Sequence, residues 1–313
     1  MGGEVPAMRL IIGFLVLLLS SGAAAQECTV RVWASFYDQR TTEEIQTLKT
    51  EDLEVKIDGK KLPVLSASRD VNNRLLILLE TEGSAKNDKL ADLVNTVTLQ
   101  ARQAPEGKPV AFGVFAEKAL FTKGFSSEPE MRTAAINTVI EEAGPLGKRV
   151  ALWDALHQAL ALFGPHQPGD TILLVGDPYD DFSRHSADGV EKEFVTSGTR
   201  LFMMRRMHGS RVDRDFLWNS HELEKTVLAR VTQETGGLLS EYMASLIRFS
   251  WAGYVLEIKL PPGVSRPHKW KVQFRGPAAE AHRKTNFYYP VRVPPCGQAD
   301  DGSQKESAQT GAF

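Results

Sequence analysis

Two short, uniformly apolar runs constrain the fold of this chain most strongly. They are "LLILL", residues 75–79, and "TILLV", residues 171–175. Each is too short and too evenly apolar for an amphipathic helix, and such runs are typical of strands buried on both faces. A strand of this kind needs a covering layer on each side, which favours a parallel sheet between two layers of helices.

Helical patterns alternate with the strand-like runs over residues 73–249. Helices are expected at 88–103, 129–143, 150–164, 190–198 and 222–237, and further strands at 109–117, 118–124 and 199–206. Strands that alternate with helices imply right-handed crossovers. We therefore predict an α/β fold with a Rossmann-like, doubly wound, mostly parallel sheet over residues 73–249.

The segments that flank this unit are rich in strand patterns. Residues 26–72 form an N-terminal β-rich lead-in, in which Asp58-Gly59 suits a two-residue hairpin turn. Residues 250–295 form a small C-terminal β module, and no helix is expected after about Ser250. Residues 296–313 are polar and small, which predicts a disordered tail.

Residues 1–25 have the pattern of a secretory signal. Arg9 precedes an apolar run, and small residues lead to a cleavage point after Ala25. We expect an extracytoplasmic protein, secreted or periplasmic, that contacts a membrane only if this segment stays attached as an uncleaved anchor. In an oxidising compartment Cys28 and Cys296 would pair. Two free thiols are the alternative.

The composition argues against two classes of function. The chain is 42% hydrophobic and 24% charged, with a formal net charge of −2, so it lacks the basic field that a nucleic-acid partner requires. It also lacks the G-x-S-x-G, H-E-x-x-H and G-x-G-x-x-G motifs. His157 is expected on the surface of its helix. We predict that the protein is not an enzyme.

Acidic residues follow both apolar runs. Glu80, Glu82 and Ser84 come after the first, and Asp177 comes after the second. Ligands of open α/β sheets bind beyond the carboxyl ends of the strands, so these residues are expected to meet there. Asp180 and Asp181 follow, without the spacing of a calcium loop, and are interpreted as a solvated turn.

The order of several stretches resembles the von Willebrand factor type A (VWFA) domains, especially a secreted bacterial group called "VWFA-related". The stretches are "LKTEDLEVKIDGKKLPV", "RLLILLETEGSA", "GKRVALWDALHQAL", "ILLVGDPYDDFSRHS", "LARVTQETGGLL" and "YVLEIKLPPG" with the strands after it. The resemblance implies a non-catalytic interaction module of the bacterial envelope, an adhesion or scaffold protein with a protein partner.

The resemblance also implies a metal-ion-dependent adhesion site, although this one is degenerate. The family pattern is D-x-S-x-S, a Thr before the central helix and a later Asp. Position by position, the matching residues of this chain are Glu80, Glu82, Ser84, Val150 and Asp177. Three of these five depart from the pattern, and Val150 has no side-chain oxygen.

Mg²⁺ demands near-ideal octahedral geometry, so no cofactor is expected. If an ion binds, Glu80, Glu82, Ser84 and Asp177 are its candidate ligands. Ca²⁺ tolerates irregular cages rich in carboxylates better than Mg²⁺ does, and a weak Ca²⁺-dependent binding protein is the alternative function. A hydrolase based on the carboxylates of Glu80, Glu82 and Asp177 is a further, weaker alternative.

Arg149, next to Lys148 and directly before Val150, is a candidate substitute for the ion. A guanidinium in this place could pair with the carboxylates of the site. The competing interpretation is that Arg149 points to solvent.

The C-terminal module concentrates aromatic residues, namely Trp270, Phe287, Tyr288 and Tyr289. Aromatic residues are common interface anchors, so a scaffold that binds through these strands is the second interpretation. Packing of the module on the α/β unit is the other.

Overall fold

The computed structural model describes residues 28–69, 73–81, 94–99, 101, 104–143, 146–176, 179–205, 226–240, 243–261, 264 and 266–294. The predicted signal segment, 1–25, and the predicted tail, 296–313, lie outside these residues. Within the described part of the chain, no helix is long and apolar enough to cross a membrane.

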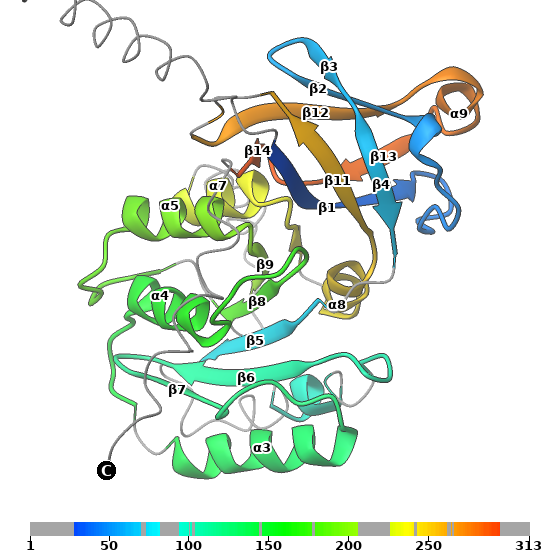
Figure 1. Cartoon of the computed structure of the whole chain (residues 1–313). Helices are drawn as coiled ribbons and strands as arrows, with labels where there is room; N and C mark the ends of the chain where they lie inside the picture. The colour runs from blue at the N-terminus through cyan, green and yellow to red at the C-terminus, as the bar shows by residue number, and fades with distance from the viewer. Residues whose placement is uncertain are drawn as a thin grey trace, which may run out of the picture.

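A six-stranded sheet forms the centre of the α/β unit (Figure 1). The strand order is β10-β9-β8-β5-β6-β7, and all neighbours are parallel except β7, which runs antiparallel to β6. The strands are β5 (Leu75–Glu80), β6 (Val110–Phe115), β7 (Ala119–Phe121), β8 (Thr171–Gly176), β9 (Arg200–Arg205) and β10 (Leu239–Ser240). The two apolar runs lie side by side in β5 and β8, which confirms the predicted mostly parallel, Rossmann-like sheet.

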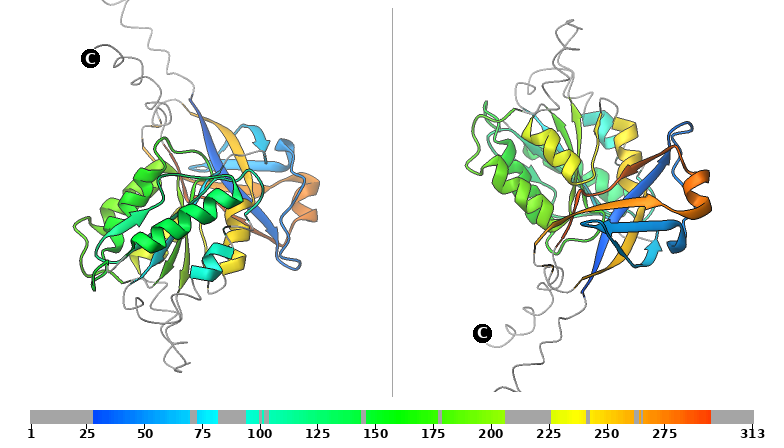
Figure 2. Two further views of the ribbon diagram at one scale, coloured as in Figure 1. Left: turned by 90° about the horizontal axis from the view of Figure 1, so that it is seen from below. Right: turned by 90° about the horizontal axis from the view of Figure 1, so that it is seen from above.

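Helices cover both faces of this sheet (Figure 2). One face packs against α4 (Leu152–Leu162), α5 (Ala187–Ser197) and α7 (Val227–Glu234). The other packs against α3 (Pro129–Glu142), α8 (Met243–Trp251) and a helical segment at residues 94–99. Every residue of β5, β6 and β8 is therefore buried.

The N-terminal and C-terminal segments build one β unit together (Figure 1). Its two four-stranded sheets have the orders β13-β1-β11-β4 and β14-β12-β2-β3. The strands are β1 (Cys28–Asp38), β2 (Leu53–Ile57), β3 (Lys60–Leu62), β4 (Val64–Ser68), β11 (Tyr254–Leu260), β12 (His268–Phe274), β13 (Thr285–Tyr288) and β14 (Arg292–Val293). Strand β1 pairs with β11, and β2 pairs with β12, so each sheet needs both ends of the chain.

The predicted hairpin turn is present between β2 and β3. Asp58 and Gly59 have φ values of 50° and 79°. Positive φ at both central positions is the geometry of a type I′ turn, which matches the right-handed twist of the flanking strands.

The expectation of no helix after about Ser250 is wrong for one short segment. Helix α8 ends at Trp251, near the expected point, but α9 (Gly276–Ala281) lies between β12 and β13. Gly276-Pro277 has the composition of a turn. However, proline is also favoured in the first turn of a helix, and the alanines that follow are good helix formers.

Candidate functional site

The candidate site lies where the strand order reverses, at the carboxyl ends of β5 and β8. Glu80, the last residue of β5, is 3% exposed. A Cβ atom at Gly176 would lie 2.5 Å from Glu80 Oε2, so only a glycine at the end of β8 leaves room for this carboxylate. Glu82, Ser84 and Asp177 lie outside the described residues. Their convergence with Glu80 stays a prediction.

Val150 is the residue that the resemblance in sequence sets against a metal-binding Thr, and its main chain is hydrogen-bonded to the loop after β8. Its nitrogen donates to Asp181 Oδ1 at 2.7 Å. Its carbonyl oxygen accepts from the main-chain nitrogens of Asp181, at 3.0 Å, and Phe182, at 3.1 Å. The side chain is 1% exposed and has no oxygen. The described part of the motif therefore does not fit the oxygen shell of Mg²⁺.

The acidic loop also caps helix α4. Asp180 Oδ1 accepts from the main-chain nitrogen of Leu152 at 2.8 Å. Ser183 Oγ accepts from the nitrogens of Trp153, at 2.9 Å, and Asp154, at 3.1 Å, and donates to Asp180 Oδ1. These bonds satisfy N–H groups that a helix N-terminus leaves unpaired. This run is a partly solvated turn, as interpreted, with Asp181 exposed, and its side chains also join the loop to α4.

Arg149 is directed to a carboxylate other than the predicted ones. Its Nε lies 3.3 Å from Glu117 Oε1, and its guanidinium carbon lies 3.5 Å from the centre of the Phe182 ring. The side chain is 52% exposed. Arg149 therefore lies on the outer surface of these loops, which corrects the expectation that it is an internal cation among Glu80, Glu82 and Asp177.

Glu117 orients the segment that carries Arg149. Its carboxylate accepts from the main-chain nitrogens of Lys148 and Arg149, each at 3.3 Å. Hydrogen bonds, first from the Lys148 main chain and then from Arg149, hold the pKa of Glu117 below its usual range. The carboxylate therefore stays ionised and fixes the loop before α4.

Two carboxylate–imidazole pairs lie beside the cap of α4. His185 Nδ1 is 2.7 Å from Asp154 Oδ1, and His157 Nδ1 is 2.8 Å from Glu193 Oε2. The two imidazole rings stack, with centres 4.0 Å apart. His157 is 38% exposed, in keeping with the predicted surface position. Sequence reasoning missed the other three residues, because the pairs form between separate elements.

The pairs link α4 to α5 and to the loop between β8 and α5. Burial tends to raise the pKa of Asp154, but hydrogen bonds from the His185 main chain, the His185 ring and the Arg184 main chain lower it overall. Asp154 is therefore an ionised acceptor that holds the loop in place.

The expectation of no cofactor stays a prediction, as do the four candidate ligands of the alternative with a bound ion. Among the residues that the structure describes, no group of three or more His, Cys, Asp or Glu side chains is arranged to hold an ion. Three of the four predicted ligands lie outside them.

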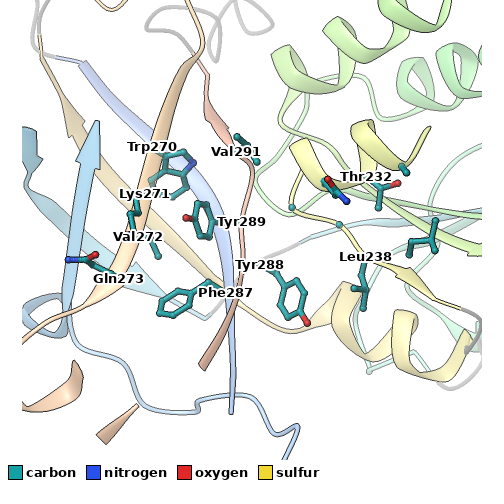
Figure 3. A pocket seen from close by; sticks show the side chains of 15 residues that line it. Thr232, Leu238, Trp270, Lys271, Val272, Gln273, Phe287, Tyr288, Tyr289 and Val291 are labelled. Atoms are coloured by element: carbon teal, nitrogen blue, oxygen red, sulfur yellow. The ribbon is translucent and has the colours of Figure 1, made fainter. Parts of the chain in front are cut away.

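The predicted aromatic cluster lies at the junction of the two units (Figure 3). Trp270 packs edge-on against Tyr289, with ring centres 5.0 Å apart, and Tyr288 packs against Phe249 of α8 at 5.6 Å. Trp270 is 6% exposed, and its indole nitrogen donates to the Pro290 carbonyl. The rings line an open cleft of about 720 Å³. Their contacts favour packing of the module over the interface-anchor interpretation.

The α/β unit touches the β unit at this cleft. A Cβ atom at Gly236, after α7, would lie 2.4 Å from the Tyr289 carbonyl carbon, and Gly236 has a φ of 73°. The Val291 nitrogen donates to the Glu234 carbonyl at 2.7 Å. Gly236, just after α7, therefore permits close contact between the units.

Three solved structures illustrate what this chain is similar to. BatB, a conserved hypothetical protein from Bacteroides thetaiotaomicron, is 14% identical over 57% of this chain and 95% of its own, with a TM-score of 0.42. Proximal thread matrix protein 1 from the mussel byssus, whose MIDAS motif holds zinc, is 14% identical over 63% of this chain and 50% of its own, with a TM-score of 0.48. A von Willebrand factor type A protein from Catenulispora acidiphila is 12% identical over 87% of this chain and 75% of its own, with a TM-score of 0.42.

No family model and no curated protein matches the chain. The structural neighbours include a von Willebrand factor type A protein. With these identities and TM-scores, function has to be argued from the residues of this chain.

Proposed function

We propose that the protein is an extracytoplasmic interaction module, an adhesion or scaffold protein, that binds a partner protein without catalysis and without a metal ion. The binding surface is the set of loops at the carboxyl edge of the central sheet. The observation that carries this proposal is the direct link between two of these loops, from Val150 to Asp181 and from Leu152 to Asp180. A surface that its own hydrogen bonds hold together needs no ion to organise it.

Three further observations support the proposal. The N-terminal signal pattern indicates export, and the resemblance in sequence is to a family of interaction modules. In the described part of the edge, the carboxylates of Glu117, Asp154, Asp180 and Asp181 all accept main-chain N–H groups. Carboxylates that are committed to holding loops suit a rigid docking surface better than acid–base chemistry.

Affinity capture tests the proposal. The mature chain, residues 26–313, is immobilised and exposed to secreted and envelope fractions of the native host, in EDTA and separately in Mg²⁺ or Ca²⁺. We expect one partner protein to be captured equally in all three conditions, and to bind again as a purified protein. Capture that requires Ca²⁺ would support the Ca²⁺-dependent alternative. Turnover in a broad hydrolase panel would contradict the non-catalytic assignment.

A further inference from the structure

The guanidinium of Arg149 is fixed on one side and open on the other. Its face lies on the Phe182 ring at 3.5 Å, and its Nε is held by Glu117 at 3.3 Å. Neither Nη group makes a hydrogen bond to another described residue. Two parallel N–H donors in a fixed plane match the two oxygens of a carboxylate, and stacking reduces the side-chain entropy that binding would cost.

Basic side chains predominate among the exposed residues around Arg149. Three further basic residues, namely Lys118, Lys148 and Arg184, are exposed on the same loops. The carboxylates of Glu117, Asp180 and Asp181 each accept a main-chain N–H group of the residues before and within α4. Of these three acidic residues only Asp181 is exposed, and Glu117 and Asp180 are half-buried.

An exposed aromatic side chain accompanies these cations. Tyr179 is 57% exposed and belongs to the same loop as Phe182, three residues away. Tyrosine and arginine are among the residues in which interface energy most often concentrates, so an exposed tyrosine on the loop that carries Phe182 is a candidate second anchor.

We propose that Arg149, oriented by Phe182 and Glu117, binds a side-chain carboxylate in an acidic segment of the partner protein. This inference rests on the proposed function and names the chemistry of the partner. Lys118, Lys148 and Arg184 add electrostatic attraction, and Tyr179 packs against the apolar part of the same segment. Recognition is by a fixed cation of the chain itself, so chelators leave it unchanged.

A peptide titration tests this inference independently of the native partner. The probe is a fluorescein-labelled octapeptide rich in Glu and Asp, and its Gln/Asn counterpart is the control. Binding to the mature chain is measured by fluorescence anisotropy at low salt in EDTA. We expect the acidic peptide to bind and Arg149→Gln to weaken binding about tenfold, the value of one charged hydrogen-bonded pair. Arg149→Lys keeps the positive charge but loses the two parallel N–H donors, so its affinity should lie between those of Arg149→Gln and the wild type.

Two more variants test whether binding depends on the paired N–H groups of the Arg149 guanidinium, rather than on positive charge in general or on a loss of folding. Arg283→Gln removes an exposed arginine of the β unit and should leave binding unchanged. Phe182→Leu removes the stacking face at constant charge and should weaken binding less than Arg149→Gln, with circular dichroism unchanged for each variant. Equal losses in Arg283→Gln and Arg149→Gln, or full binding by Arg149→Gln, would overturn the inference.

Three other outcomes also decide the question. Displacement of the peptide by millimolar inorganic phosphate would show that the Arg149 guanidinium prefers a phosphoryl group to a carboxylate, which would contradict the inference. Binding that EDTA abolishes would mean that an ion is the acceptor, also against it. If the native partner is captured equally by wild type and Arg149→Gln, the inference fails while the proposed function stands.

Discussion

Asp181 Oδ1 accepts a hydrogen bond from the main-chain nitrogen of Val150 at 2.7 Å. This bond joins the loop after β8 to the segment that leads into α4. The bond uses the main chain of Val150, so the two loops are held together here without a side-chain hydroxyl at position 150. A valine is therefore compatible with an ordered edge at the place where the related pattern has a metal-binding threonine.

The cap of α4 predicts a loss of stability in Asp180→Ala. The substitution removes the acceptor of the Leu152 N–H group and the partner of Ser183. Loss of a capping side chain costs about 1–2 kcal/mol, and Asp180→Asn should restore most of it because an amide oxygen still accepts. Urea unfolding measures the change. Glu141→Ala, at an exposed position of α3, is the control and should change stability by less than about 0.5 kcal/mol.

The missing ligand at Val150 predicts weak or absent binding of ions. Calorimetric titration of the mature protein with Mg²⁺ and with Ca²⁺ should show no micromolar site. Val150→Thr should not create one, and should cost about 1–2 kcal/mol of stability, because the side chain is 1% exposed and the new hydroxyl is buried. Micromolar Mg²⁺ binding by the wild type that Asp177→Ala abolishes would contradict this prediction.

The sequence predicts those features that depend on neighbours along the chain. The runs at 75–79 and 171–175 form buried strands because apolar side chains project from both faces of each strand, so neither face favours contact with water. Asp58-Gly59 predicts its turn because few residues accept positive φ. In each case the physical cause lies within a few residues.

Features that join distant segments could not be predicted in the same way. Arg200 is fully buried, with its guanidinium 4.8 Å from the Trp33 ring and bonded to the Ser250 carbonyl. Burial lowers its pKa to about 9. Its partners Trp33, Thr171 and Ser250 come from β1, β8 and α8, so no pattern close to Arg200 in the sequence indicates that it is buried. For the same reason the Glu117–Arg149 pair was missed at the candidate site.

The pKa of Glu54 predicts acid sensitivity of the β unit. Hydrogen bonds from Lys56 and then from Lys61 lower this pKa from 4.5 to about 2. Because the folded pKa is depressed, the stabilisation is fully present above about pH 4.5 and is lost as the pH falls toward 2. The stability difference between wild type and Glu54→Gln, measured by urea unfolding, should therefore shrink over this window. A difference that is constant from pH 5 to pH 2 would contradict the assignment. Glu280→Gln, on exposed α9, controls for the loss of one carboxylate.

A disulfide between Cys28 and Cys296 would link the N-terminal strand of the β unit to the C-terminal end of the chain. Cys28 is disulfide-bonded, and Cys296, which lies outside the described residues, is the other cysteine of the sequence. In the β unit Cys28 begins β1 and lies opposite Leu260 of β11. Closing so long a loop contributes up to about 5 kcal/mol in the chain-entropy model. If the two cysteines pair, Cys28→Ser, Cys296→Ser and the double variant should all lose the same stability, since each removes the same bond. Additive small losses, or two free thiols in peptide maps of oxidised protein, would show that they do not pair.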